Sequence, residues 1–198
     1  ASAPALDRAV SVDCDPGLES GIGSVQWDEQ GNRLTLTPIV ASGEWATPLV
    51  TNQSPVGGAL SARSASIDEH PTACPSNVVL LPGDTPLLDM EAGLSRGFLV
   101  DAPTRCVFNP VTRRLRLECQ VGWELFRGER HRMYRDLALE VDLDIAWNSV
   151  VALGSVVDGR LWSRQFPATL TPTTSAIPVG VWTAPVCLPN IRVAGVGA

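Results

Sequence analysis

The stretch "LALEVDLDIAW", residues 137–147, alternates apolar and polar side chains and decides the fold class predicted for the chain. Successive side chains of an extended strand point to opposite faces, so a two-residue period is typical of a β-strand with one buried face. Leucine, valine, isoleucine and tryptophan would share one face, while Glu140, Asp142 and Asp144 would share the other. We therefore predict a strand over 137–147.

The three carboxylates of this stretch have two interpretations. They would stand about 7 Å apart along the strand, too wide for one divalent ion unless loops add ligands. An inverting glycoside hydrolase tolerates such spacing, but one of its carboxyls must be buried. The preceding predicted strand, 112–126, presents Arg114 and Arg116 on its polar face, and the short connection makes the two strands antiparallel neighbours. We favour solvated cross-strand arginine–carboxylate pairs over a catalytic or metal site.

The rest of the chain reads as short extended runs separated by turns. Its 16 prolines and 17 glycines favour many short elements, and no long stretch keeps a helical period. The sequence therefore predicts an all-β fold, an antiparallel two-sheet β-sandwich of the jelly-roll type with roughly eight to ten strands. We expect one domain over 1–198, with a long irregular loop at 51–77 and a Pro-rich C-terminal segment at 167–198. The other predicted elements are a hairpin of 24–27 and 33–38 around the turn 28–32, strands at 44–50, 78–84, 97–101 and 105–108, a basic connection at 127–135, a hairpin turning at Asp158-Gly159, and short helical turns at 67–70 and 86–92.

Composition and charge restrict the partners. The net charge is −6, which disfavours nucleic acid as a partner because phosphate binding needs a basic face. No apolar run approaches the ~20 residues that span a bilayer, so no membrane insertion is expected. The cysteines lack a C-x-x-C pair, which argues against a zinc knuckle, and both disulfides and buried thiols stay open. The five cysteines are Cys14, Cys74, Cys106, Cys119 and Cys187.

No catalytic motif stands out. Walker A, H-E-x-x-H and EF-hand patterns are missing from the sequence. Glu69, His70 and Cys74 lie near one another in sequence, but a nucleophilic thiol needs a base and an orienting group held in place, and this segment has little apolar periodicity. His131 lies among arginines and is interpreted as a solvated loop residue. We therefore expect a protein that is not an enzyme and has neither a metal nor another cofactor.

The strongest positive patch is the basic connection at 127–135. Arginine forks bind anionic groups bidentately, so the patch is a candidate contact for an anionic glycan or an acidic partner. Acidic residues close by in sequence favour internal pairing instead. The patch consists of Arg127, Arg130, Arg132, Arg135 and Tyr134.

With no catalytic set, the sequence favours a structural or binding module. We expect a viral capsid or surface-protrusion domain at the virion surface, which mediates assembly or host attachment and self-associates into a symmetric assembly. Its receptor would be a glycan or a protein. One alternative is a secreted bacterial adhesin or carbohydrate-binding module. A second alternative is a hydrolase on a β-sandwich scaffold that uses Glu140 or Asp142.

Overall fold

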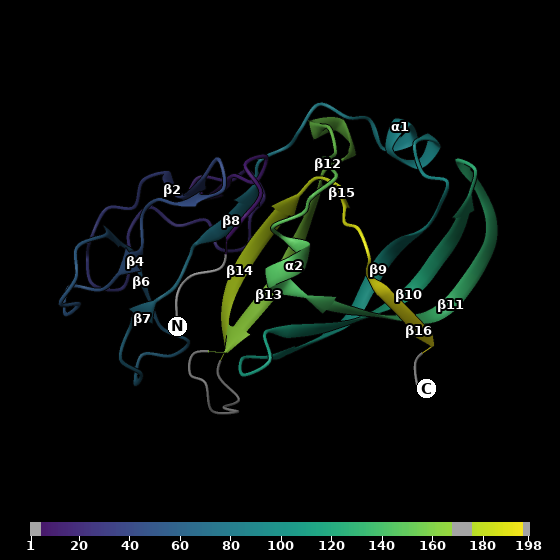
Figure 1. Ribbon diagram of the computed structural model, residues 1–198. Coiled ribbons are helices and arrows are strands. Elements are labelled where there is room, and N and C mark those ends of the chain that lie inside the picture. The colour runs from purple at the N-terminus through teal and green to yellow at the C-terminus, as the bar shows by residue number, and fades with distance from the viewer. Residues whose placement is uncertain (1–4, 168–175, 196–198) are drawn as a thin grey trace. The chain divides into compact units, whose positions relative to one another are not determined.

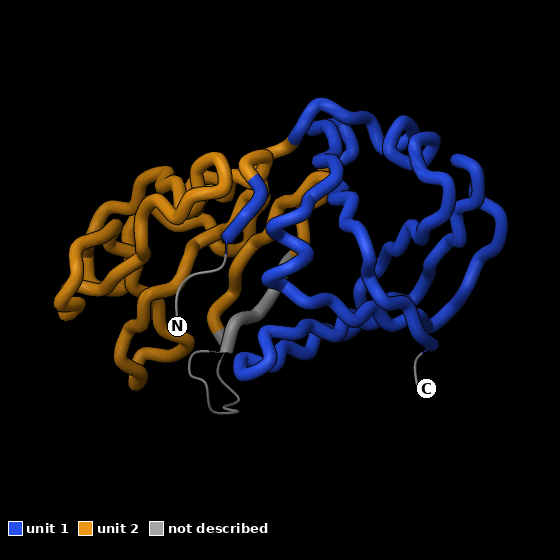
Figure 2. The backbone as a smooth tube through the Cα atoms, in the orientation of Figure 1, with its two compact units in different colours: residues 1–7, 83–158, 185–198 blue, residues 8–82, 159–184 orange. Residues whose placement is uncertain are grey.

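The computed structural model describes residues 5–167 and 176–195 and is built mainly of strands. The chain divides into two compact units, each assembled from segments far apart in sequence (Figure 2). Of the described residues, 5–7, 83–158 and 185–195 form the first unit, and 8–82, 159–167 and 176–184 form the second. The single domain over 1–198 stays a prediction.

The second unit contains a six-stranded mixed sheet in the order β13-β14-β8-β1-β2-β3 (Figure 1). Strand β14 runs parallel to β8 and the other neighbours are antiparallel. Two-residue ladders join β4 to β5 and β6 to β7, so the predicted irregular loop at 51–77 is partly ordered. The bounds are β1 Val12–Cys14, β2 Thr37–Ala41, β3 Glu44–Trp45, β4 Leu49–Val50, β5 Ala59–Leu60, β6 Ala62–Arg63, β7 Thr72–Ala73, β8 Asn77–Leu80, β13 Arg160–Pro167 and β14 Ala176–Thr183.

The side-chain amide of Asn77 is fully buried inside this unit. Its Oδ1 accepts hydrogen bonds from the backbone N–H groups of Gly23 and Gly180, both at 3.0 Å. Its Nδ2 donates to the carbonyl of Asp15 at 2.8 Å and to the hydroxyl of Ser24 at 2.9 Å. All four hydrogen-bonding positions of the amide are therefore used, as a buried polar side chain requires.

The predicted reversal at 28–32 is confirmed, although its flanks form only the single bridge Trp27↔Arg33. Gly31 takes the left-handed conformation with φ 80°, which glycine adopts without strain. The buried carboxylate of Asp28 accepts hydrogen bonds from the backbone of Asn32 at 2.8 Å and of Ala62 at 3.0 Å. One side chain therefore holds the turn against β6.

The first unit is built around a four-stranded antiparallel sheet in the order β16-β11-β10-β9. The strands predicted at 97–101 and 105–108 are one continuous strand. The basic connection predicted at 127–135 is wrong, because only Arg127 and Gly128 form a turn and the rest is strand. Both turn residues have positive φ, as a two-residue hairpin turn of type I′ requires. The bounds are β9 Arg96–Asn109, β10 Arg114–Phe126, β11 Glu129–Asp142, β12 Ala152–Leu153, β15 Val186–Cys187, β16 Arg192–Gly195, α1 Leu87–Ala92, α2 Leu143–Ala146 and the 3₁₀ helix η1 Val156–Asp158.

Two irregularities bend this sheet at the level of Cys119 on the central strand β10. On one side β9 contains an extra residue and Ala102 has φ 53°. On the other side Asp136 of β11 has φ 56°. Left-handed residues inside a ladder bend the strand and increase its twist. Figure 1 shows β9, β10 and β11 curving.

The stretch at 137–147 is a strand only as far as Asp142, and α2 follows. The predicted cross-strand pairs are confirmed: Arg114 lies opposite Asp142 and Arg116 opposite Glu140, with N–O distances of 3.7 and 3.4 Å. Strand β10 begins at Arg114, which pairs with Asp142. Residues after Asp142 therefore have no partner on β10, and they form the short helix α2. Ile145 is consequently 60% exposed rather than buried.

The jelly-roll sandwich is wrong. The described residues form a six-stranded sheet, a four-stranded sheet and three two-stranded ladders, with both parallel and antiparallel pairs. The predicted hairpin at Asp158-Gly159 is also wrong, because β12 pairs with β15 and β13 pairs with β14. Alternation identifies a strand but leaves its partner undetermined, which is why the strands were assigned to the wrong sheets. The helices described are all too short or too polar to cross a membrane.

Candidate functional site

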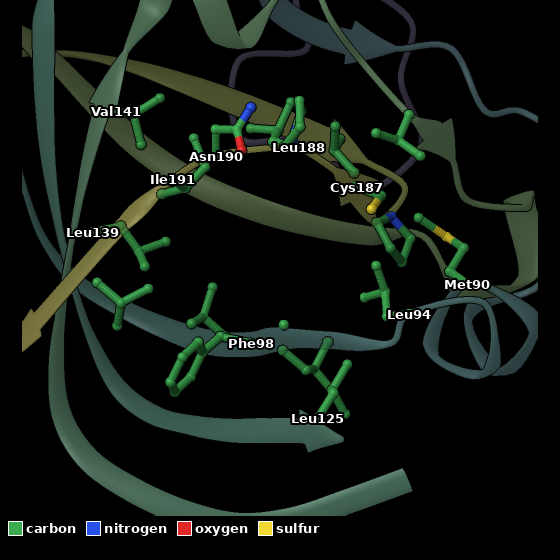
Figure 3. Close-up of a pocket in the computed structure, with 18 of the residues that line it drawn as sticks. Met90, Leu94, Phe98, Leu125, Leu139, Val141, Cys187, Leu188, Asn190 and Ile191 are labelled. Atoms are coloured by element: carbon green, nitrogen blue, oxygen red, sulfur yellow. The ribbon is translucent and has the colours of Figure 1, made fainter. Parts of the chain in front are cut away.

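A cavity of about 650 Å³ lies within the first unit and is the candidate site. The bent sheet provides one wall, α1 a second, and the segment 185–193 a third. In Figure 3, Leu139, Phe98 and Leu125 of the sheet, Leu94 after α1 and Leu188 of the segment surround a common space. The volume lies within the 300–1,000 Å³ typical of pockets for small ligands.

The walls follow from the strand pattern. Leu115, Leu117 and Leu125 are odd-numbered positions of β10 and therefore lie on one face of that strand, and all three line the cavity. Leu139 and Val141 line it from β11. The apolar face that the sequence alternation predicts therefore forms a cavity wall where the sheet is bent.

The third wall is a short segment held at both ends. Strand β15 pairs with β12, and β16 pairs with residues 137–140 of β11. Between them, Pro189 and Asn190 carry the chain past the cavity, and Asn190 has φ 56°. The wall is thus anchored by backbone ladders on either side rather than by side chains alone.

The two ionic side chains of the wall bind partners of their own. Glu91 of α1 is only 5% exposed, and both its oxygens accept from Arg130 of β11, Oε2 from Nε at 2.8 Å and Oε1 from Nη2 at 2.6 Å. This hydrogen bond with Glu91 raises the pKa of Arg130. Arg96 lies 3.3 Å from Glu124, whose other oxygen accepts from the Tyr134 hydroxyl at 3.1 Å. The charges at the wall are therefore compensated from within the unit.

The cavity is open to solvent, and its walls are mostly aliphatic. Water against such walls finds few hydrogen-bonding partners. An apolar occupant therefore gains free energy by replacing this water.

The residues of the predicted basic patch do not share one contact but lie against different partners. Arg130 and Tyr134 bind the carboxylates described above, and the Arg127 guanidinium lies 5.2 Å from the ring centre of Phe126. Arg132 and Arg135 are exposed on β11. A contact of this patch with an anionic glycan or acidic partner stays a prediction.

The candidate metal and nucleophile residues are not brought together. His70 lies exposed in the connection between β6 and β7 of the second unit, whereas His131 is exposed on β11 of the first, with its ring 6.4 Å from that of Phe126. Cys74 is buried in a cluster with Ile177 and Val179, and burial raises the pKa of its thiol to about 11, so the thiolate is not the prevailing form at neutral pH. In the part of the chain that the structure describes, no three His, Cys, Asp or Glu side chains are grouped to hold a metal ion. The described cysteines are all free thiols.

The sequence interpretation missed Glu91 and the cavity itself. Glu91 follows "LLDM" in a segment predicted only as a short helical turn, and its partner Arg130 is 39 positions away. A carboxylate among apolar residues of a short helix was a usable signal, because buried acids are nearly always paired. The bend of the sheet coincides with positive φ at Ala102 and Asp136, and alanine gives no sequence signal for this conformation.

Comparison with known proteins identifies the relatives of the chain. The family model described as the PmbA/TldA metallopeptidase C-terminal domain matches residues 3–197. No match is found among curated proteins.

Solved structures share the fold at low identity. A candidate modulator of a DNA gyrase from Thermotoga maritima is 17% identical with a TM-score of 0.71, and the match covers 96% of this chain and 40% of that one. TldE from Thermococcus kodakarensis is 15% identical with a TM-score of 0.65 over the same shares, 96% and 40%. A candidate gyrase modulator from Bacteroides thetaiotaomicron is 19% identical with a TM-score of 0.60, covering 76% of this chain and 32% of that one. The chain thus spans less than half the length of these proteins.

These findings overturn the predicted role. The viral capsid or surface-protrusion domain and its place on the virion are wrong, because the matching family is one of metallopeptidases and the matching structures come from bacteria and an archaeon. The secreted adhesin and carbohydrate-binding alternatives are wrong for the same reason, and so is the expectation that the protein is not an enzyme. The second alternative, a hydrolase on a β-sandwich scaffold, is wrong in its scaffold, because the described residues do not form a two-sheet sandwich. Self-association into a symmetric assembly, a glycan or protein receptor, and the exclusion of nucleic acid and membrane insertion remain predictions.

Proposed function

The chain belongs to the PmbA/TldA metallopeptidase C-terminal domain family, and on this premise we propose that it binds peptide substrates for such a peptidase, with the cavity of the first unit holding their apolar side chains. The observation that carries the proposal is the cavity: its volume, its aliphatic walls and its compensated charges suit the side chains of an unfolded peptide.

The metal that the family implies does not fit the described residues. A catalytic zinc site uses three His, Cys, Asp or Glu ligands and keeps one position open, and the described residues supply no such group. We propose that the metal ligands come from polypeptide other than the described residues. We assign no chemical step to this chain beyond binding and the exclusion of water.

The sheet and α1 contribute to peptide binding in different ways. The bent sheet offers an aliphatic surface that backbone ladders hold in place. Helix α1 is joined to the tip of the β10–β11 hairpin by the Glu91–Arg130 pair and by the backbone bond from Gly128 N–H to the Leu94 carbonyl at 2.9 Å. A preformed apolar wall needs little ordering when a ligand binds, which favours affinity.

The proposal is tested by a substitution that fills the cavity. Leu139→Trp places a larger side chain in the cavity, while Leu36→Trp makes the same change at a position that is 61% exposed in the second unit. Binding of a fluorescently labelled ten-residue peptide rich in leucine is measured by anisotropy for the unmodified chain and both variants, after thermal unfolding shows that each is folded.

We expect Leu139→Trp to weaken binding by about tenfold or more, because it occupies volume that the peptide needs. Leu36→Trp should bind as the unmodified chain does. The proposal is overturned if the unmodified chain binds no peptide, or if folded Leu139→Trp binds as tightly as Leu36→Trp.

A further inference from the structure

The cavity wall combines aliphatic side chains with two ionic groups, and the way these groups are paired determines what the cavity accepts. Glu91 and Arg96 line it together with leucines, valines, Met90, Phe98 and Trp147. A pocket that recognised a charged ligand would present an ionic group with unused hydrogen-bonding capacity. Glu91 is paired with Arg130, and Arg96 is paired with Glu124.

Glu91 has little capacity left for a ligand. Its side chain is 7% exposed, and the Arg130 guanidinium approaches both carboxylate oxygens in the bidentate arrangement typical of strong arginine–carboxylate pairs. The positive charge of Arg130 cancels the negative charge of Glu91 at the cavity surface. A ligand ammonium group in the cavity would therefore have to compete with Arg130.

Arg96 is engaged in a similar way, although less tightly. It lies 3.3 Å from Glu124 and its side chain is 74% exposed, so its head group is also solvated. A ligand carboxylate placed among the leucines would leave water without gaining a buried cation. Moving an uncompensated charge into apolar surroundings is strongly unfavourable.

Resting on the proposed function, we infer that the cavity is a selectivity pocket for large uncharged side chains, aliphatic or aromatic, and that the Glu91–Arg130 pair is its specificity determinant. Arg130 acts through Glu91 and does not need to touch the peptide. As long as it neutralises Glu91, the pocket rejects both acidic and basic side chains.

The volume agrees with this assignment. An apolar cavity of about 150 Å³ already binds a benzene ring, and the present one is about 650 Å³. It has room for more than one such group, so a peptide with two nearby apolar side chains should bind better than a peptide with one.

The experiment compares three labelled peptides that differ at two central positions, which are leucine, lysine or glutamate. It uses the whole chain and the variant Arg130→Met, which keeps an unbranched aliphatic side chain but removes the guanidinium. Arg132→Met is the matched control, two residues along the same strand and exposed. For the unmodified chain and for Arg132→Met we expect the leucine peptide to bind about 10- to 100-fold more tightly than either charged peptide.

In Arg130→Met the carboxylate of Glu91 faces the cavity without its cation. The lysine peptide should then gain at least about tenfold in affinity, while the glutamate peptide gains nothing. The double variant Glu91→Gln with Arg130→Met should restore the preference for leucine. If the single variant does not fold, Glu91→Gln takes its place: it leaves the Arg130 guanidinium without its anion, so the glutamate peptide rather than the lysine peptide should gain affinity.

The outcomes separate this inference from the proposed function. If no peptide binds to the unmodified chain, the proposed function fails. If the three peptides bind equally well, peptide binding stands but the selectivity is wrong. If leucine is preferred and Arg130→Met behaves as Arg132→Met does, Glu91 and Arg130 do not determine specificity. A lysine peptide that gains affinity only in Arg130→Met supports the inference.

Discussion

The interiors of the two units differ in how they are filled. In the second unit the fully buried amide of Asn77 satisfies four hydrogen-bonding groups around it, and Cys74, Ile177 and Val179 form a buried apolar cluster. In the first unit a bent sheet, α1 and the segment 185–193 surround about 650 Å³ of space lined by aliphatic side chains. The filled interior stabilises its unit, whereas the hollow one leaves apolar surface available to a ligand. A larger side chain should therefore lower the free energy of unfolding more in the filled unit than in the hollow one.

The largest effect is expected from removing the central amide of the filled unit. Asn77→Ala leaves the N–H groups of Gly23 and Gly180 without their acceptor, and it opens a cavity. Loss of a buried, fully bonded network should lower the free energy of unfolding by about 3–5 kcal/mol. Urea titration measures this, with the exposed Asn148→Ala as a control that should change by less than about 0.5 kcal/mol. Equal stability of the two variants would show that the amide does not hold this unit together.

A methyl group at Gly23 should have the next largest effect. Its Cβ would overlap the carbonyl oxygen of Ser76, which is backbone and cannot turn aside. We expect Gly23→Ala to lower the free energy of unfolding by about 2–3 kcal/mol, because overpacking forces a backbone shift. Gly57 has open space around it and ordinary φ, so Gly57→Ala should be neutral or slightly stabilising. Thermal unfolding compares the two, and a Gly23→Ala protein as stable as Gly57→Ala would refute close packing here.

Replacing a valine by a larger residue in each unit compares the filled interior with the hollow one directly. Val179 is fully buried in the second unit, and Val179→Phe should cost about 1–3 kcal/mol through overpacking. Val141 lines the cavity of the first unit, so the larger ring of Val141→Phe has space to occupy and should cost less than about 1 kcal/mol. Urea titration of both variants decides the comparison. Similar losses at the two positions would mean that the cavity is not available space.

The smallest effect is a pH dependence that originates in the turn at 28–32. Burial tends to raise the pKa of Asp28, but hydrogen bonds from Asn32, Ala62 and Gln30 outweigh burial and hold the pKa below its ordinary value of 3.8. A carboxyl whose pKa is lowered by folding contributes stability that is fully present above its unfolded pKa and is lost as the pH falls through the folded pKa. Urea titrations between pH 6 and pH 2.5 should show a steeper acid loss for the unmodified chain than for Asp28→Asn. Parallel curves would contradict this role of Asp28.

The sequence predicted what depends on neighbours along the chain. Alternation located the strands at 112–126 and 137–142, the Gly-Asn pair located the turn at 28–32, and the facing of Arg116 and Glu140 followed from adjacent strands. The parallel pairing of β8 with β14 was not predictable, because it joins residues about 100 positions apart and parallel partners leave no turn signal.

The cavity was out of reach for a related reason. Its walls come from segments far apart in sequence, and the Glu91–Arg130 pair joins residues 39 positions apart. Positive φ occurs at Ala102 and Asp136 where the sheet bends, and alanine rarely adopts this conformation. The capsid role was an analogy from the fold, and many unrelated functions share similar folds.

The most direct test of the account is to observe where a leucine-rich peptide binds. Methyl NMR of leucine and valine side chains during titration should show peptide-dependent shifts at Leu117, Leu139, Val141 and Leu188, which line the cavity. Leu36 and Leu60 of the second unit should not shift. Shifts confined to the second unit, or none at saturating peptide, would contradict the claim that the hollow interior is the binding site.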